Sequence, residues 1–222
     1  MPKLRVVSYN VRGLKDDRAA LGEVIRDLAP DVLFAQEAPR RFRWRHKCAE
    51  LARSGGMLYA SGGLPGLGNA ILVSMRVTVE EAWGLRYPLT PGRHLRGAAF
   101  ARCSVAKVPF LAVGTHLATD DTERPAQAAL LAATIREAGG TTIFGGDINE
   151  TEGGSAWRTL ADTRTDAGAT NQTPTFSVTN PSRRIDALFA DKTCTVTSYS
   201  VIDTPAVRRA SDHFPIYAEI TL

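Results

Sequence analysis

The sequence has few cysteines and no long apolar run. Its three cysteines, Cys48, Cys103 and Cys194, form no CxxC pair, which argues against a disulfide framework and against a thiolate zinc site. No stretch of 18 apolar residues occurs, so no helix is expected to span a membrane. Residues 1–10 lack an apolar signal segment. These absences favour a cytoplasmic protein with reduced thiols.

The chain also lacks internal repeats, low-complexity segments and any stretch with the composition of a linker. Apolar residues make up 44% of its 222 positions, which is ample for a sizeable core. We therefore expect a single domain that covers residues 1–222, and a monomer. The sequence indicates no protein partner.

The charge is unevenly distributed along the chain. Formal net charge is +4, but residues 1–53 hold 12 Lys/Arg against 7 Asp/Glu, whereas residues 54–222 hold 15 against 16. The excess is concentrated in the segment Arg40-Arg41-Phe42-Arg43-Trp44-Arg45-His46-Lys47. A polyanionic partner would suit such a patch, and a solvated helix face without any partner explains it equally well.

The first 37 residues predict a strand, a helix and a second strand. Leu4–Tyr9 is rich in β-prone residues, a helical pattern follows until Pro30, and Asp31–Ala35 is almost continuously apolar, as in an inner strand. Such a unit predicts a right-handed crossover and parallel pairing. Asn10 and Glu37, which follow the two strands, should then meet at the edge where α/β proteins place ligands.

Polar residues follow other apolar strands in the same way. The buried pattern of Thr141–Phe144 ends at Gly145-Gly146 and exposes Asp147 and Asn149. We expect a basic helix over Pro39–Arg53, a short helix near Ser155–Leu160 followed by a long loop over the site, and a loop that carries Arg208 and Arg209. The polar residues placed at strand ends are Asn10, Glu37, Asn69, His116, Asp147, Asn149, Asp186, Asp212 and His213.

This set predicts metal-assisted hydrolysis of a phosphoester. Carboxylates without cysteine ligands suit a hard cation such as Mg²⁺ or Mn²⁺. Histidines beside carboxylates suit general acid–base work near neutral pH. Asp186 lies inside the apolar run Ile185–Phe189, and because a buried charge needs a partner, a protonated His213 would serve.

The sequence resembles the endonuclease/exonuclease/phosphatase superfamily, which has the DNase I-like fold. Eight motifs carry the resemblance in the family's order, from residue 8 to residue 215: SYNVR (8–12), QE (36–37), GNA (68–70), RG (96–97), GTHL (114–117), GDIN (146–149), RID (184–186) and SDHFP (211–215). The resemblance implies a four-layer α/β sandwich, in which two mixed β-sheets pack face to face with helices outside.

The resemblance also implies roles for individual residues. Glu37, Asn10 and Asp212 are similar to the residues of the metal site. His213, oriented by Asp186, is similar to the histidine that acts as general base or phosphate stabiliser, and Asp147 to the residue that positions or deprotonates water. Asn149 would steady the oxyanion, and His116 resembles the acid on the leaving-group side. Phosphate contacts are expected from Asn69, Arg96, Arg40, Arg41 and Arg184.

We therefore expect a divalent-metal-dependent phosphodiesterase that acts on nucleic acid, with DNA favoured and no membrane partner. The basic segment after Glu37, with Phe42 and Trp44 interleaved, could hold backbone phosphates and stack on a base. One alternative keeps the chemistry and changes the substrate to a phospholipid head group, an inositol phosphate or a nucleotide. An alternative of another class is a non-catalytic nucleic-acid-binding module.

Overall fold

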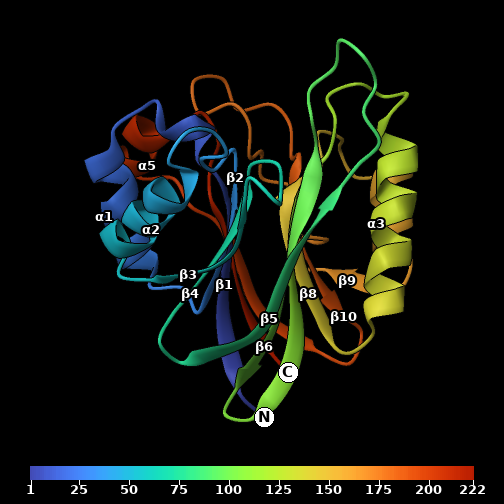
Figure 1. Ribbon diagram of the computed structural model, residues 1–222, viewed down its shortest axis with the longest axis horizontal. Coiled ribbons are helices and arrows are strands. Elements are labelled where there is room, and N and C mark those ends of the chain that lie inside the picture. Colours follow the sequence, from blue (N-terminus) through green and yellow to red (C-terminus); the bar gives the residue numbers. More distant parts are fainter.

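The structure is a computed structural model that describes all 222 residues. It contains two mixed β-sheets of six strands each (Figure 1). The first sheet has the order β11 (Thr195–Val201), β12 (Ile216–Thr221), β1 (Lys3–Asn10), β2 (Val32–Gln36), β4 (Asn69–Val73), β3 (Leu58–Gly63). The second has the order β5 (Val77–Arg86), β6 (Gly97–Val105), β7 (Val108–His116), β8 (Thr142–Asp147), β10 (Asp186–Asp191), β9 (Arg164–Asp166).

Helices cover the outer face of each sheet, and three apolar clusters fill the spaces between the four layers. The helices α1 (Arg18–Leu28), α2 (Trp44–Ser54) and α5 (Pro205–Ala210) pack on the first sheet, and α3 (Arg124–Ala138) and α4 (Ser155–Ala161) pack on the second. The central cluster joins the inner faces of the two sheets. The predicted four-layer α/β sandwich is therefore confirmed.

Close contact between the sheets depends on a glycine beneath the site. Phe34 of β2 is fully buried in the central cluster. A Cβ atom on Gly145 of β8 would lie 2.6 Å from the Phe34 ring and 2.8 Å from Leu188, which is closer than carbon atoms pack in proteins. The first of the two glycines before Asp147 thus lets the sheets approach where the polar residues begin.

The register of the strands brings several polar ends to one edge of the sandwich. β1 and β2 pair in parallel with Asn10 opposite Gln36, as expected from the strand–helix–strand opening. β7 and β8 are also parallel, with His116 opposite Asp147. β10 pairs antiparallel to β8, so that Asp186 starts its strand where Asp147 ends the other.

Some predicted boundaries were wrong. The basic helix begins at Trp44 rather than Pro39, because Arg43 takes a left-handed backbone conformation with φ of 58° just before it. The segment with Arg208 and Arg209 is the helix α5, capped by the Thr204 side chain with proline in its first turn. Within the predicted loop after α4, residues 164–166 form the edge strand β9. No helix of the structure is long and apolar enough to cross a bilayer.

Candidate active site

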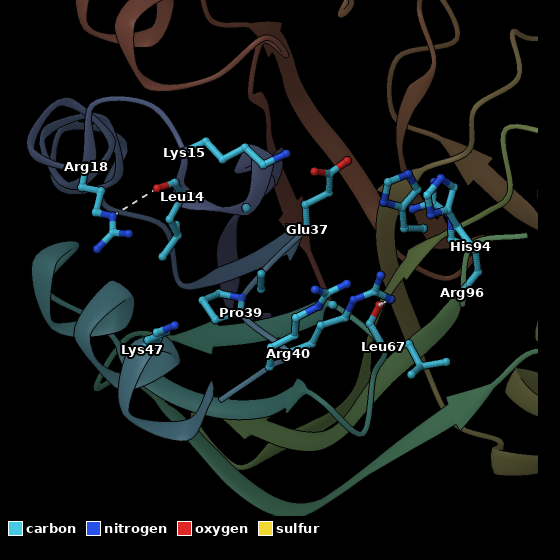
Figure 2. Close-up of a pocket in the computed structure, with 15 residues that line it drawn as sticks. Leu14, Lys15, Arg18, Glu37, Pro39, Arg40, Lys47, Leu67, His94 and Arg96 are labelled. Atoms are coloured by element: carbon cyan, nitrogen blue, oxygen red, sulfur yellow. Dashed lines mark hydrogen bonds between the residues drawn. The ribbon is translucent and has the colours of Figure 1, made fainter. Parts of the chain in front are cut away.

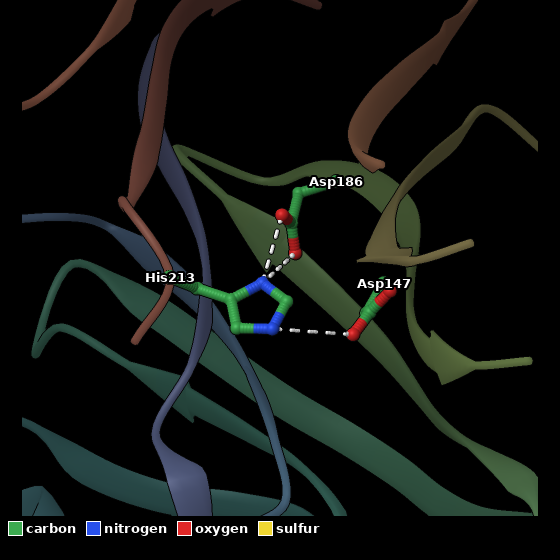
Figure 3. A group of neighbouring side chains, drawn as sticks. All are labelled: Asp147, Asp186 and His213. Carbon is green, nitrogen blue, oxygen red and sulfur yellow. Dashed lines mark hydrogen bonds and ion pairs between the residues drawn. The ribbon is translucent and has the colours of Figure 1, made fainter. Parts of the chain in front are cut away.

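A buried aspartate–histidine pair lies at the centre of this edge. The Nδ1 atom of His213 lies 3.0 and 3.2 Å from the two carboxylate oxygens of Asp186, and both side chains are buried (Figure 3). Burial by itself lowers the pKa of His213, but the carboxylates of Asp186 and Asp147 outweigh it and raise the pKa to about 9. His213 is therefore an imidazolium at neutral pH, as the sequence predicted for the partner of Asp186.

Asp147 faces the other side of the His213 ring. Its Oδ2 atom lies 3.7 Å from His213 Nε2 and accepts a hydrogen bond of 3.1 Å from the Asn10 amide. Burial, followed by the charge of Asp186, raises the pKa of Asp147 to about 7. The carboxylates of Asp147 and Asp186 and the His213 ring offer ligand atoms within 4.8 Å of one another. The site thus holds two carboxylates and one fixed cationic group.

His116 completes the central group from the end of β7. Its Nε2 atom lies 3.2 Å from Asp147 Oδ2 and 3.0 Å from the Asn149 amide nitrogen, which also donates to the Leu117 carbonyl. Burial, followed by the positive charges of Arg96 and His213, places the pKa of His116 well below its usual value. His116 is therefore neutral, and the contact with Asp147 is not an ion pair. The Asn149 amide nitrogen thus contacts both His116 and the carbonyl of the residue that follows β7.

Glu37 is the carboxylate that is free to receive a cation. Its backbone has a φ of 54°, a left-handed conformation uncommon for residues other than glycine. The carboxylate makes no hydrogen bond or ion pair and lines the pocket described below. Asp212, by contrast, pairs at 3.1 Å with Arg12, whose backbone N–H donates to Asn10 Oδ1. Arg12 therefore links the Asn10 and Asp212 side chains.

A strongly cationic pocket opens beside these groups. Its volume is about 630 Å³, and both Glu37 and His116 line it (Figure 2). Glu37 is the only acidic residue in the lining, and none of the Lys and Arg residues there forms an ion pair. Unpaired cations around a cavity favour an anionic ligand. The lining cations are Lys15, Arg18, Arg40, Arg41, Lys47 and Arg96.

The model of the Endonuclease/Exonuclease/phosphatase family matches residues 7–213 of this sequence. The chain belongs to this family. The family's name covers endonucleases, exonucleases and phosphatases, all of which hydrolyse phosphoesters. The comparison with curated proteins gives no match.

Solved structures of the family have the same fold. D. rerio TDP2, complexed with a single-strand DNA product, is 23% identical with a TM-score of 0.82, and the match covers 100% of both chains. A truncated Caenorhabditis elegans TDP2 is 20% identical with a TM-score of 0.78, over 99% of this chain and 98% of that one. A mannosyl-6-phosphatase from Bacteroides thetaiotaomicron is 18% identical with a TM-score of 0.81, over 99% and 100%.

Three of the residues that were expected to contact phosphate make structural contacts in the fold. Arg184 is buried, pairs with Asp166 and Glu152, and lies over the Trp157 ring at 4.6 Å. The Asn69 amide donates to the carbonyls of Gly66 and Gly97, which joins the loop before β4 to the first residue of β6. Arg40 makes a similar connection between the carbonyls of Leu67 and Leu95, although it also lines the pocket. Arg96 and Arg41 line the pocket without an ion pair.

Sequence reasoning missed two supports of the aspartate–histidine pair. The buried Thr175 hydroxyl accepts hydrogen bonds from the backbone N–H groups of Ile185 and Asp186. The Phe176 ring packs on the His213 ring with centroids 4.7 Å apart. A signal was present, because Phe176 is the only aromatic residue between 161 and 182. An isolated aromatic residue in a polar segment indicates a place where that segment packs on the body of the protein.

Proposed function

We propose that this protein is a divalent-metal-dependent phosphodiesterase that hydrolyses nucleic acid. One observation carries the proposal: Asp147, beside the buried Asp186–His213 pair, contacts His116, which lines a pocket with unpaired cations and one unpaired carboxylate, Glu37. A phosphate bound there would meet positive charge, a proton acceptor and a place for a metal ion. A phosphoester is the substrate class that needs all three.

The residues present fit a hard divalent cation. Glu37, Asn10 and Asp212 offer oxygen atoms, and no cysteine lies among them, as Mg²⁺ and Mn²⁺ prefer. Glu37 has no partner, and the Arg12–Asp212 pair is partly exposed, with side chains 45% and 32% accessible, so it opens at little cost. A bound cation would polarise the phosphoryl group and offset its negative charge.

The remaining chemistry falls to the side chains of the site. His213, held by Asp186, would stabilise the charge that develops on the phosphoryl oxygens. Asp147 would position the attacking water and accept its proton. His116 is neutral without a substrate, but a phosphate anion beside it would raise its pKa and let it protonate the leaving oxygen. The Asn149 amide, which contacts His116, would keep that ring in place.

Nucleic acid is the substrate that the charge distribution favours. The unpaired cations lie on several sides of the pocket, with Lys15 and Lys47 across from Arg96 (Figure 2). Such a distribution suits a ligand that carries more than one phosphate group. A related fold binds single-strand DNA in D. rerio TDP2. The mannosyl-6-phosphatase neighbour supports a second candidate, a phosphomonoesterase acting on a small phosphorylated molecule.

The test is a panel of plasmid, single-stranded DNA, RNA, abasic DNA, sphingomyelin, a sugar phosphate and a generic phosphodiester, each with Mg²⁺, Mn²⁺ or chelator. We expect metal-dependent turnover of nucleic acid that His213→Ala abolishes. Met75→Ala is the control, because Met75 is 88% exposed and lies in the turn after β4. Full activity of His213→Ala would refute the assignment. Turnover of the sugar phosphate alone would favour the phosphomonoesterase.

A further inference from the structure

The most exposed aromatic side chain of the protein follows, in the sequence, two residues that line the cationic pocket. Phe42 is 84% exposed, and it is the only aromatic residue among the large apolar side chains that lie at the surface. It follows Arg40 and Arg41, which line the pocket, and precedes the first residue of α2. Nothing in the fold buries this ring.

Trp44, the other aromatic residue of the basic segment, is already engaged. Its ring packs edge-on against Tyr59 with centroids 6.4 Å apart, and the Arg45 guanidinium lies 4.4 Å from its centroid. A Cβ atom on Gly63 would lie 2.4 Å from the Trp44 ring, so the ring rests directly on the backbone of β3. Trp44 therefore anchors α2, and only Phe42 has a free face.

The short turn that carries Phe42 is fixed at both ends. On one side, Arg40 donates to the carbonyls of Leu67 and Leu95. On the other side, Trp44 packs on β3. A side chain held between two such anchors loses little backbone freedom when it binds a ligand. The turn thus presents Phe42 as a preorganised contact.

The cations around Phe42 have no carboxylate partner. Five cations lie within the segment Arg40–Lys47, and none of them forms an ion pair. Elsewhere, Arg76, Arg102, Arg184 and Arg208 are all paired with carboxylates. An aromatic face between unpaired cations matches a nucleotide strand, in which phosphates alternate with flat bases. The five cations are Arg40, Arg41, Arg43, Arg45 and Lys47.

We propose that Phe42 stacks on an unpaired base of the substrate strand while the neighbouring arginines bind its phosphates, so that the enzyme prefers single-stranded nucleic acid over duplex. The inference rests on the proposed function, because it assigns the substrate of that same pocket. In a duplex, each base already stacks on its neighbours and is not available to a side chain at the surface. Stacking on Phe42 therefore strengthens binding only for a strand whose bases are unpaired.

A binding experiment separates stacking from charge. The probes are fluorescent oligo(dA), an abasic backbone of equal length and charge, and a hairpin duplex, each titrated in chelator so that no turnover occurs. We expect the wild-type protein to bind oligo(dA) about 10-fold more tightly than the abasic backbone, because stacking on one aromatic side chain contributes on that order. Phe42→Ala should abolish this ratio, and Phe42→Trp should retain it. Hairpin binding should be the same in the wild type and both variants.

A control variant at Met75 tests whether loss of any exposed apolar side chain changes the affinities. Met75 is 88% exposed and lies in the turn after β4, beside the Ser74 N–H that donates to the Asp31 carbonyl, far along the strand from the site. Met75→Ala should therefore leave all three affinities unchanged. Equal ratios in the wild type and Phe42→Ala would overturn the stacking proposal, as would failure of the wild type to bind any strand. Loss of the ratio in a protein that hydrolyses no nucleic acid would support the stacking contact and refute only the proposed function.

Discussion

Two buried aspartates, Asp31 and Asp147, lie at opposite ends of the sandwich and differ in the charges that surround them. Asp31, before β2, accepts hydrogen bonds from Arg76, from Ser74 and from the backbone of Arg5. Asp147, after β8, lies near the carboxylate of Asp186 instead, and burial with that like charge raises its pKa to about 7. The negative charge of Asp31 is thus compensated by the donors around it. The negative charge of Asp147 is not compensated, because the carboxylate of Asp186 lies beside it.

We infer from this difference that Asp31 has a structural role and Asp147 a functional one. Both carboxylate oxygens of Asp31 have donors, so this side chain joins β1, β2 and the turn after β4. At the other end, the charge of Asp147 is unfavourable until a ligand adds positive charge. Perturbed groups of this kind gather at active sites, where they serve chemistry at a cost to stability.

The largest effect should come from Asp147→Asn. Loss of the proton acceptor is expected to lower kcat by about 100- to 10,000-fold. The thermal stability should not fall, because the substitution removes a negative charge that faces Asp186. Steady-state kinetics and thermal unfolding in chelator at pH 8 check both parts. A large loss of thermal stability with normal kcat would show that Asp147 is structural.

The matched substitution at the other end, Asp31→Asn, should do the reverse. It weakens contacts with Arg76 and with the Arg5 N–H, and we expect the free energy of unfolding to fall by about 1–3 kcal/mol. The lower part of that range applies if water screens the half-exposed Arg76 guanidinium. Denaturant titration measures the change, and kcat should stay within about 2-fold. Unchanged stability would contradict the structural role.

The pH dependence of stability, measured in chelator, should show the unfavourable charge of Asp147. Because Asp147 holds its proton up to about pH 7 in the folded protein, whereas an unfolded aspartate loses it near 3.8, the folded state binds more protons in that window. Stability should therefore fall as the pH rises from about 4 to 7. Asp147→Asn should flatten this slope. Equal slopes in the wild type and Asp147→Asn, measured by unfolding at each pH, would contradict the account.

His213 makes stability depend on pH over a second, higher pH range. Its folded pKa of about 9 lies above the unfolded value of 6.5. The stability that its charge contributes is fully present below pH 6.5 and is lost as the pH rises through 9. His213→Ala should therefore reduce the loss of stability between pH 7 and 9, and His46→Ala should leave it as in the wild type.

The smallest effects should separate free from paired arginines. Arg41→Ala is expected to raise KM for nucleic acid a few-fold, and to reduce the slope of log KM against log salt by roughly one phosphate contact. Its melting temperature should not change, since Arg41 forms no ion pair. Arg76→Ala should lower the melting temperature and leave the salt slope unchanged. The opposite pattern would mean that the unpaired cations do not contact substrate.

The layers of this fold could be predicted from the sequence because the inner strands have clear apolar patterns with distinct ends. Val32–Ala35 is continuously apolar and Ile143–Gly146 ends in glycines, and both lie buried where the pattern placed them. The missed elements are short or lie at an edge. α5 spans six residues and β9 spans three, too few for a periodic pattern to appear. The start of α2 at Trp44 was missed because one left-handed residue, Arg43, ends the turn before it.

The central members of the site could also be predicted, since polar side chains at the ends of neighbouring strands must meet. His116, Asp147, Asp186 and His213 do so. The individual partners could not be predicted. Arg184 follows a basic neighbour in the sequence, yet the fold encloses it with Asp166 and Glu152. Such pairing depends on loops that close in three dimensions, and no local pattern encodes it.

The most direct test follows the release of product from a fluorescent single-stranded oligonucleotide by the wild-type protein. The rate is measured before chelation, in chelator, and after Mg²⁺ or Mn²⁺ is restored. The account predicts turnover that stops in chelator and returns with the metal. Turnover at the same rate in chelator, or none on any phosphoester of the panel, would contradict it.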